Sequence, residues 1–139
     1  MGQEDHLRTV GEFTAAIDAH DRAAAYACLA PGLEWHALGL VVAADQPVYQ
    51  GREAVWTYIE SLYETFSALS IEVARADVVG NAVVARVELR GEPVGSAGGV
   101  EAQWSSVLSF RDGLIARVDN YEDHDEAVTD AELRLGMTS

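Results

Sequence analysis

The stretch from Val100 to Tyr121 reads VEAQWSSVLSFRDGLIARVDNY, and this stretch decides the fold. Asp112-Gly113 divides it, and an Asp-Gly pair between apolar runs is a strong two-residue hairpin signal. Ahead of this turn the residues alternate, so that every second side chain lies on one face of a strand. The face that we assign to the interior carries Val100, Ala102, Trp104, Ser106, Leu108 and Phe110. The stretch therefore predicts an antiparallel pair of strands with one face against a core.

The same two-residue period continues upstream from Ser70. Gly80-Asn81 is a second hairpin signal between apolar runs. A connection over residues 91–99, which contains four glycines, leads into the strand that begins at Val100. These segments predict a four-stranded antiparallel meander. In its second strand the interior residues are expected to be Val83, Ala85, Val87 and Leu89.

Helical spacing of apolar residues marks the part of the chain before the meander. A first helical segment is expected over residues 4–29, with a polar break at residues 18–22. A second helix is expected from Gly51 to Leu69. Between them lie a predicted strand, residues 33–38, and a loop, residues 39–50; a short helix is expected over residues 123–135. Helices on one face of an antiparallel sheet make an α+β domain, and we predict one domain over residues 1–139.

Composition restricts the partners of this domain. The net charge is −14 and every cation is arginine, so phosphate backbones and anionic membranes are repelled. Neither nucleic-acid binding nor membrane binding is expected. Cys28 is the single cysteine, and we interpret it as a small core residue. The acidic start, MGQEDHLRTVGEF, has no hydrophobic segment of the signal-peptide kind, which favours a cytoplasmic location.

Three stretches, in this order, resemble a known family. They are LEWH at residues 33–36, YQGREAV at residues 49–55, and FRDGLI at residues 110–115 running to NYED at residues 120–123. Together with the element order they resemble the SnoaL-like polyketide cyclases, ketosteroid isomerases and limonene-epoxide hydrolases of the nuclear transport factor 2-like superfamily. The resemblance covers almost the whole chain. It implies a cone-shaped fold, in which a curved antiparallel sheet packs against N-terminal helices and encloses an apolar pocket.

The resemblance also implies site residues. His36 falls where the isomerases hold their aspartate base, and Phe13 falls where they hold the tyrosine of the oxyanion hole. Ser106 falls where they hold the protonated aspartic acid of that hole. Asn120 falls where the epoxide hydrolases hold a catalytic aspartate. His36 is then the candidate base, since an imidazole can remove a proton near neutral pH. The alternative interpretation is a hydrogen-bonded histidine in the pocket wall.

Further residues are predicted to line the pocket. Tyr58 and Trp104, like Phe13, have rings that can stack on a planar ligand, or can serve as ordinary core. Val118 shares the expected inward face with Asn120 and Ser106. The other histidines, at positions 6, 20 and 124, lie in polar helical contexts and are expected at the surface. Their spacing fits no zinc site and no glycine loop fits a phosphate, so neither metal nor cofactor is expected.

Two functions remain open at this point. One is a cofactor-independent enzyme of the cyclase, isomerase or hydrolase kind, which acts by acid–base chemistry on an apolar, carbonyl-bearing substrate. The other is a non-catalytic module that binds a hydrophobic ligand or mediates association. Two structural expectations accompany them. The loop of residues 39–50 is expected to cover the pocket as a lid, and Val107, Ile115 and Tyr121 are expected to form an outer patch for a two-fold dimer.

Overall fold

The computed structural model describes residues 3–36, 48–95 and 98–133. Its order of elements confirms the α+β class predicted from the sequence. No helix within those three ranges is both long enough and apolar enough to cross a membrane. The helices are α1 (Gln3–Asp18), α2 (Arg22–Ala27), α3 (Arg52–Thr65) and α4 (His124–Ala131). The strands are β1 (Leu29–His36), β2 (Val48–Gln50), β3 (Ser70–Val79), β4 (Ala82–Gly91), β5 (Val100–Arg111) and β6 (Leu114–Tyr121).

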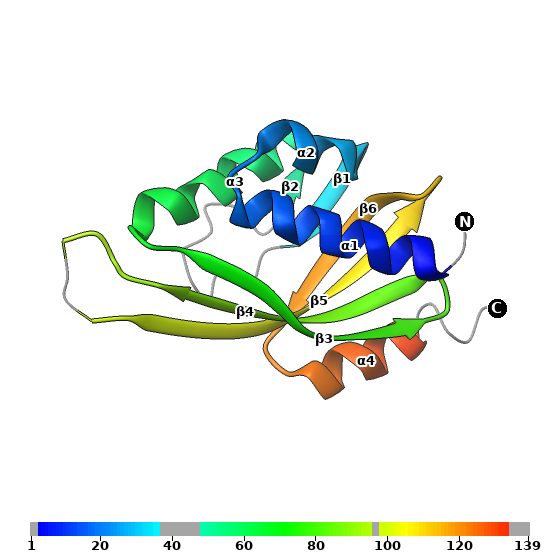
Figure 1. Ribbon diagram of the computed structural model, residues 1–139. Helices are drawn as coiled ribbons and strands as arrows, with labels where there is room; N and C mark the ends of the chain where they lie inside the picture. Colours follow the sequence, from blue (N-terminus) through cyan, green and yellow to red (C-terminus); the bar gives the residue numbers. More distant parts are fainter. Residues whose placement is uncertain (1–2, 37–47, 96–97, 134–139) are drawn as a thin grey trace.

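All six strands belong to one curved sheet, in the order β2-β1-β6-β5-β4-β3 (Figure 1). The predicted meander from β3 to β6 is confirmed. Both predicted hairpin turns are present, and Gly80, Asp112 and Gly113 have the positive φ angles that such turns require. One ladder departs from the antiparallel pattern, because β1 runs parallel to β6.

The sheet separates two layers of helices. Helices α1 and α3 lie over one face, which we call the inner face, and α4 lies under the other (Figure 1). The main core fills the space between the inner face and the helices, and Cys28 belongs to it as predicted. A second, smaller core lies between the outer face and α4. It consists of Val79, Ala82, Val84, Val107, Ala127 and Ala131.

This second core corrects the predicted dimer patch. Val107 has no exposed surface, because α4 covers it. Ile115 is buried in the main core, on the opposite side from the prediction, because the pairing of β5 with β6 shifts register between Ser109 and Phe110. Tyr121 packs against the second core and donates a hydrogen bond to Asp130. The three residues therefore do not form an exposed patch.

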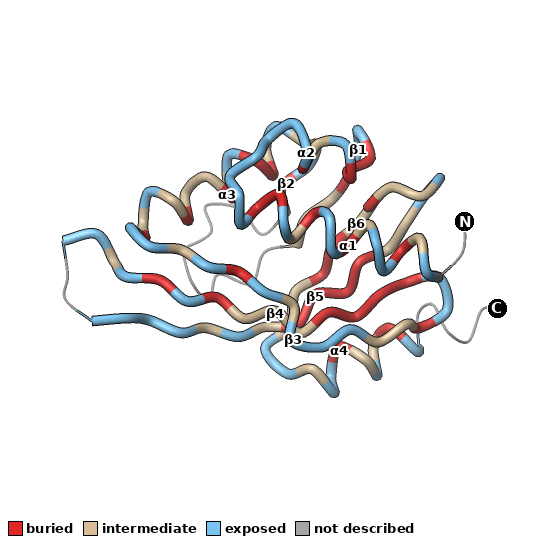
Figure 2. Tube along the Cα trace, in the orientation of Figure 1, coloured by how far each residue is buried: buried red, intermediate tan, exposed pale blue. Residues whose placement is uncertain are grey.

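Strand β1 begins at Leu29, four residues earlier than the sequence predicts. Its register against β6 is irregular between Leu29 and Glu34, and this irregularity accommodates Pro31, which cannot donate to a ladder. Beyond it the strand alternates normally. Far from β1, the hairpin of β4 and β5 extends past the helices, and its described residues Val94, Gly95 and Gly98 are exposed (Figure 2).

Candidate functional site

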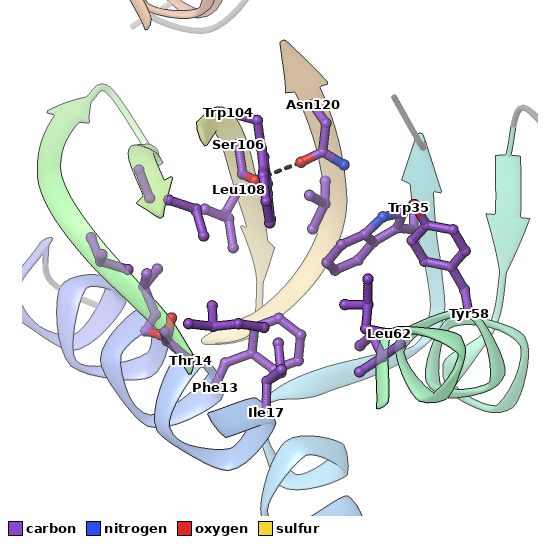
Figure 3. Close-up of a pocket in the computed structure, with 17 residues that line it drawn as sticks. Phe13, Thr14, Ile17, Trp35, Tyr58, Leu62, Trp104, Ser106, Leu108 and Asn120 are labelled. Carbon is purple, nitrogen blue, oxygen red and sulfur yellow. Dashed lines mark hydrogen bonds between the residues drawn. The ribbon is translucent and has the colours of Figure 1, made fainter. Parts of the chain in front are cut away.

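A cavity of about 80 Å³ lies between the inner face of the sheet and helices α1 and α3 (Figure 3). It is partly open to solvent, and its volume is enough for several waters or a small ring. The cavity lies where the sequence predicts an apolar pocket. Its lining consists of Val10, Phe13, Thr14, Ile17, Trp35, Tyr58, Ile59, Leu62, Ile71, Val73, Ala85, Val87, Trp104, Ser106, Leu108, Val118 and Asn120.

Aromatic rings form much of the wall. Trp104 projects inward because it lies in the same alternating set as Ser106 and Leu108 on β5, as predicted. Trp35 on β1 pairs with Val118 on β6 and shares its face. The rings of Phe13 and Trp35 meet edge to face, with centroids 6.1 Å apart. These flat surfaces suit a planar apolar ligand.

The polar groups of the sheet wall meet at one corner. The hydroxyl of Ser106 on β5 donates to Asn120 Oδ1 on β6 at 2.5 Å, and Figure 3 shows the two groups pointing toward each other. Asn120 Nδ2 donates in turn to the main-chain carbonyl of His36 at 2.9 Å. We call Ser106, Asn120 and this carbonyl the polar corner. The register that pairs Ser106 with Asn120 is what brings the first two together.

Tyr58 on α3 supplies the titratable group of the lining. Burial, and secondarily the neighbouring Tyr49, raises the pKa of the Tyr58 hydroxyl above its ordinary value. The two rings lie 4.7 Å apart, so Tyr49 from β2 holds Tyr58 in place. The hydroxyl is therefore neutral near pH 7 and remains a potential hydrogen-bond donor. Of the described lining residues, none is an aspartate, glutamate, histidine, lysine or arginine.

His36 does not line the described cavity. Its strand neighbour Trp35 faces inward, so the imidazole lies on the outer face, beside Asp119. There Nε2 lies 3.6 Å from a carboxylate oxygen of Glu34, and Nδ1 lies 3.9 Å from one of Asp119. The prediction that this imidazole reaches the cavity as a base disagrees with this placement. Only the main-chain carbonyl of His36 contributes to the polar corner.

The structure brings together the other six predicted site residues. Phe13, Tyr58, Trp104, Ser106, Val118 and Asn120 all line the cavity. The sequence analysis did not include Trp35 among the pocket residues, although the alternation of side chains along this strand could have indicated it. If apolar Leu33 faces inward, as the structure shows, alternation places Trp35 inward and His36 outward. The predicted lid falls mostly on residues 37–47, which lie outside the described residues.

Two other histidines are also misplaced by the sequence reading. His6 is buried and stacks on Phe110, with ring centroids 4.1 Å apart. His124 at the start of α4 lies 2.8 Å from Ser105 Oγ through Nδ1 and 2.7 Å from Asp77 Oδ2 through Nε2. Ser105 has no exposed surface, so this Ser–His–Asp set anchors α4 to the sheet and presents no nucleophile.

No group of three or more metal-binding side chains gathers within the described ranges of the chain. On the outer face the imidazole of His36 lies 3.6 Å from Glu34 and 3.9 Å from Asp119, and these three side chains do not form such a group.

Comparisons with known proteins agree with this geometry. No curated protein matches the chain in sequence. Among solved structures, an NTF2-like protein of unknown function from Burkholderia pseudomallei is 19% identical, with a TM-score of 0.72 over 93% of this chain and 97% of that one. A putative SnoaL-like polyketide cyclase from Jannaschia sp. is 18% identical, with a TM-score of 0.68 over 91% of this chain and 90% of that one.

A third structure is TerC, co-crystallised with polyporic acid. It is 12% identical, with a TM-score of 0.72 over 91% of this chain and 96% of that one. At such identities these likenesses concern the fold alone. The model of the SnoaL-like domain family matches residues 10–118, which reach from α1 into β6 and include most of the cavity lining. This chain therefore belongs to the SnoaL-like domain family.

Proposed function

We propose that this protein binds a small, uncharged, largely apolar ring compound in the cavity between α1, α3 and the sheet. One observation carries the proposal: the described lining is aromatic and aliphatic, with neutral polar groups and no charged side chain. An ionised ligand would have no counter-charge there and would pay the full cost of leaving water. A neutral ring instead gains from the removal of its apolar surface from water.

The size of the cavity sets the expected affinity. The cavity is small, at about 80 Å³, and it is partly open to solvent. A ligand of about ten non-hydrogen atoms at usual efficiencies binds with a Kd on the order of 0.1 mM. Among structures of the same fold, TerC was co-crystallised with polyporic acid, which supports an organic small molecule as the kind of ligand.

A second candidate is an enzyme of the cyclase or isomerase kind. The Tyr58 hydroxyl favours it, because a neutral phenol in an apolar site can donate to a developing oxyanion. The putative polyketide cyclase from Jannaschia sp. has the same fold. A base remains to be identified for such a reaction, because the imidazole of His36 lies on the other face of the sheet. Binding without chemistry is therefore the better supported function.

Tryptophan fluorescence tests the binding proposal directly, because Trp35 and Trp104 both line the cavity. The variant Ala85→Leu extends a buried side chain into the space and is expected to abolish quenching by 2-naphthol. The matched control is Ala15→Leu, which lies on the exposed side of α1 and should bind like the wild type. Equal affinity in Ala85→Leu and the wild type, with both folded, would place the ligand elsewhere and refute the proposal.

We further propose that the protein acts as a cytoplasmic homodimer and binds neither nucleic acid nor membranes. The net charge of −14 supports the second part. With Val107 covered by α4, a dimer would have to use other residues than those first expected. Light scattering across a hundredfold range of concentration measures this directly, and a constant monomer mass would refute the dimer.

A further inference from the structure

The polar corner has a fixed direction of hydrogen bonding. A main-chain carbonyl can only accept, so the group of Asn120 that contacts the carbonyl of His36 must be the amide nitrogen. This orients the carboxamide and turns Oδ1 toward Ser106. Because Oδ1 also can only accept, the hydroxyl hydrogen of Ser106 must point at it. The order of donors and acceptors follows from one carbonyl group.

The hydrogen bonds within the polar corner determine which donors and acceptors it can present to a ligand. The single hydrogen of the Ser106 hydroxyl is committed to Asn120 at 2.5 Å, so Oγ presents lone pairs to the cavity. Thr14, the other aliphatic hydroxyl residue of the described lining, is in the same state, because its hydrogen is donated to the carbonyl of Val10 at 2.8 Å. The hydroxyls of Ser106 and Thr14 are therefore acceptors toward the ligand, whereas the phenol of Tyr58 keeps its hydrogen as a donor. Asn120 retains a second amide hydrogen, which can donate.

On this basis we infer that the natural ligand carries a hydroxyl group, an alcohol or a phenol, that donates its hydrogen to Ser106 Oγ. The inference rests on the proposed function and narrows its ligand class. A ligand with only a carbonyl at this position would bring oxygen lone pairs against those of Ser106, and the two oxygens could form no hydrogen bond with each other. Such mismatches in buried sites cost more than a missing contact.

The ionisation state of the ligand follows from the same corner. The described part of the lining offers no cation to a phenolate, and the lone pairs of Ser106 would repel one. The hydroxyl must therefore be bound in its neutral form. For a phenol, affinity should fall as the pH rises through the ligand's own pKa.

Three probes of similar shape separate these possibilities. 2-Naphthol can donate and accept, 2-acetonaphthone can only accept, and 2-methylnaphthalene can do neither. Titrations that follow tryptophan quenching should rank 2-naphthol first with the wild-type protein. In Ser106→Ala the affinity for 2-naphthol should fall about 3- to 10-fold, the usual net effect of one hydrogen bond. The affinity for the hydrocarbon should stay unchanged, and the affinity for the ketone should not fall, because the variant removes the lone pairs that oppose its carbonyl.

Two further variants complete the experiment. Ser109→Ala removes a hydroxyl from the same strand outside the cavity lining, and should leave all three affinities as in the wild type. Asn120→Leu releases the Ser106 hydrogen, so the ketone should gain affinity relative to 2-naphthol. Thermal denaturation shows whether each variant is folded. If Asn120→Leu does not fold, the hydroxyl preference is tested by Ser106→Ala alone.

The outcomes distinguish this inference from the function on which it rests. If none of the three probes binds the wild-type protein, the proposed binding function fails, and the hydroxyl preference fails with it. If the probes bind but Ser106→Ala weakens 2-naphthol and 2-acetonaphthone equally, or weakens neither, the cavity binds ligands and the hydroxyl preference is overturned.

Discussion

Asn120 on β6 donates its amide hydrogen to the main-chain carbonyl of His36 on β1, with 2.9 Å between nitrogen and oxygen. The sequence singled out both residues as catalytic candidates, and the fold does bring them into contact. The contact uses the backbone of His36, while its imidazole lies on the other face of the sheet near Glu34 and Asp119. The two residues therefore have different expected sensitivities to mutation.

The first prediction separates those two residues. His36→Ala should leave the affinity of the cavity for 2-naphthol unchanged, because an alanine keeps the carbonyl that holds Asn120. Asn120→Ala should weaken binding about 3- to 10-fold, since it removes the partner that orients Ser106. Fluorescence titration of both variants measures this. If His36→Ala lost as much affinity for 2-naphthol as Asn120→Ala, the imidazole of His36 would have to contribute to the site.

The second prediction concerns the ionisation of Tyr58. Its folded pKa is raised by burial, so its contribution to the free energy of unfolding is fully present below about pH 10. That contribution is lost as the pH rises through the folded pKa. Wild type should therefore show a phenolate absorbance that Tyr58→Phe lacks, and the midpoint of this difference should lie above pH 10. A midpoint at or below pH 10 would contradict the buried environment of this hydroxyl.

The third prediction concerns the attachment of α4. His124 is half-buried between Ser105 and Asp77, so His124→Ala should lower the free energy of unfolding by about 1–3 kcal/mol, because it removes a hydrogen-bond partner from the buried Ser105 hydroxyl and from Asp77. Urea denaturation at pH 7 measures the loss. Ser109→Ala on the same strand is the control and should behave like the wild type. An unchanged stability would mean that the contacts of α4 do not depend on this histidine.

The fourth prediction follows from the same histidine. Its hydrogen bond is the largest cause that lowers the pKa of Asp77 below the ordinary value. A lowered folded pKa gives stability that is present above the unfolded pKa, about 3.9, and is lost as the pH falls through the folded value. Asp77→Asn should thus be less stable than wild type at pH 7, with a difference that shrinks on acidification. Glu72→Gln, exposed on the same strand, should show no such pattern.

The fifth prediction pairs two glycines. A Cβ on Gly91 would lie 2.8 Å from Cδ1 of Phe66, so Gly91→Ala should cost about 1–3 kcal/mol. A Cβ on Gly11, within α1, meets no atom within 4 Å, so Gly11→Ala should add about 0.5–1 kcal/mol through helix propensity. Thermal melts of the two variants should shift in opposite directions. A stabilising Gly91→Ala would show that Phe66 moves freely.

Local sequence patterns predicted the strand faces and the hairpin turns of this protein. The alternation along β5 correctly places Trp104, Ser106 and Leu108 in the cavity wall, because side chains alternate faces in any extended strand. Asp112-Gly113 and Gly80 correctly mark the hairpins, because positive φ angles favour these residues. These features depend on neighbours in the chain, so the sequence by itself predicts them.

Tertiary structure decided the rest. The face of His36 depends on the parallel pairing of β1 with β6, whose partners are about 80 residues away along the chain, with an irregular register between them. The burial of Val107 depends on α4 folding back under the sheet. The direction of the polar corner depends on a carbonyl of one strand meeting a carboxamide of another. Contacts between distant segments carry no local period. For this physical reason the sequence predicted much of the cavity wall, whereas only the tertiary structure decided the face on which His36 lies and the direction of the polar corner.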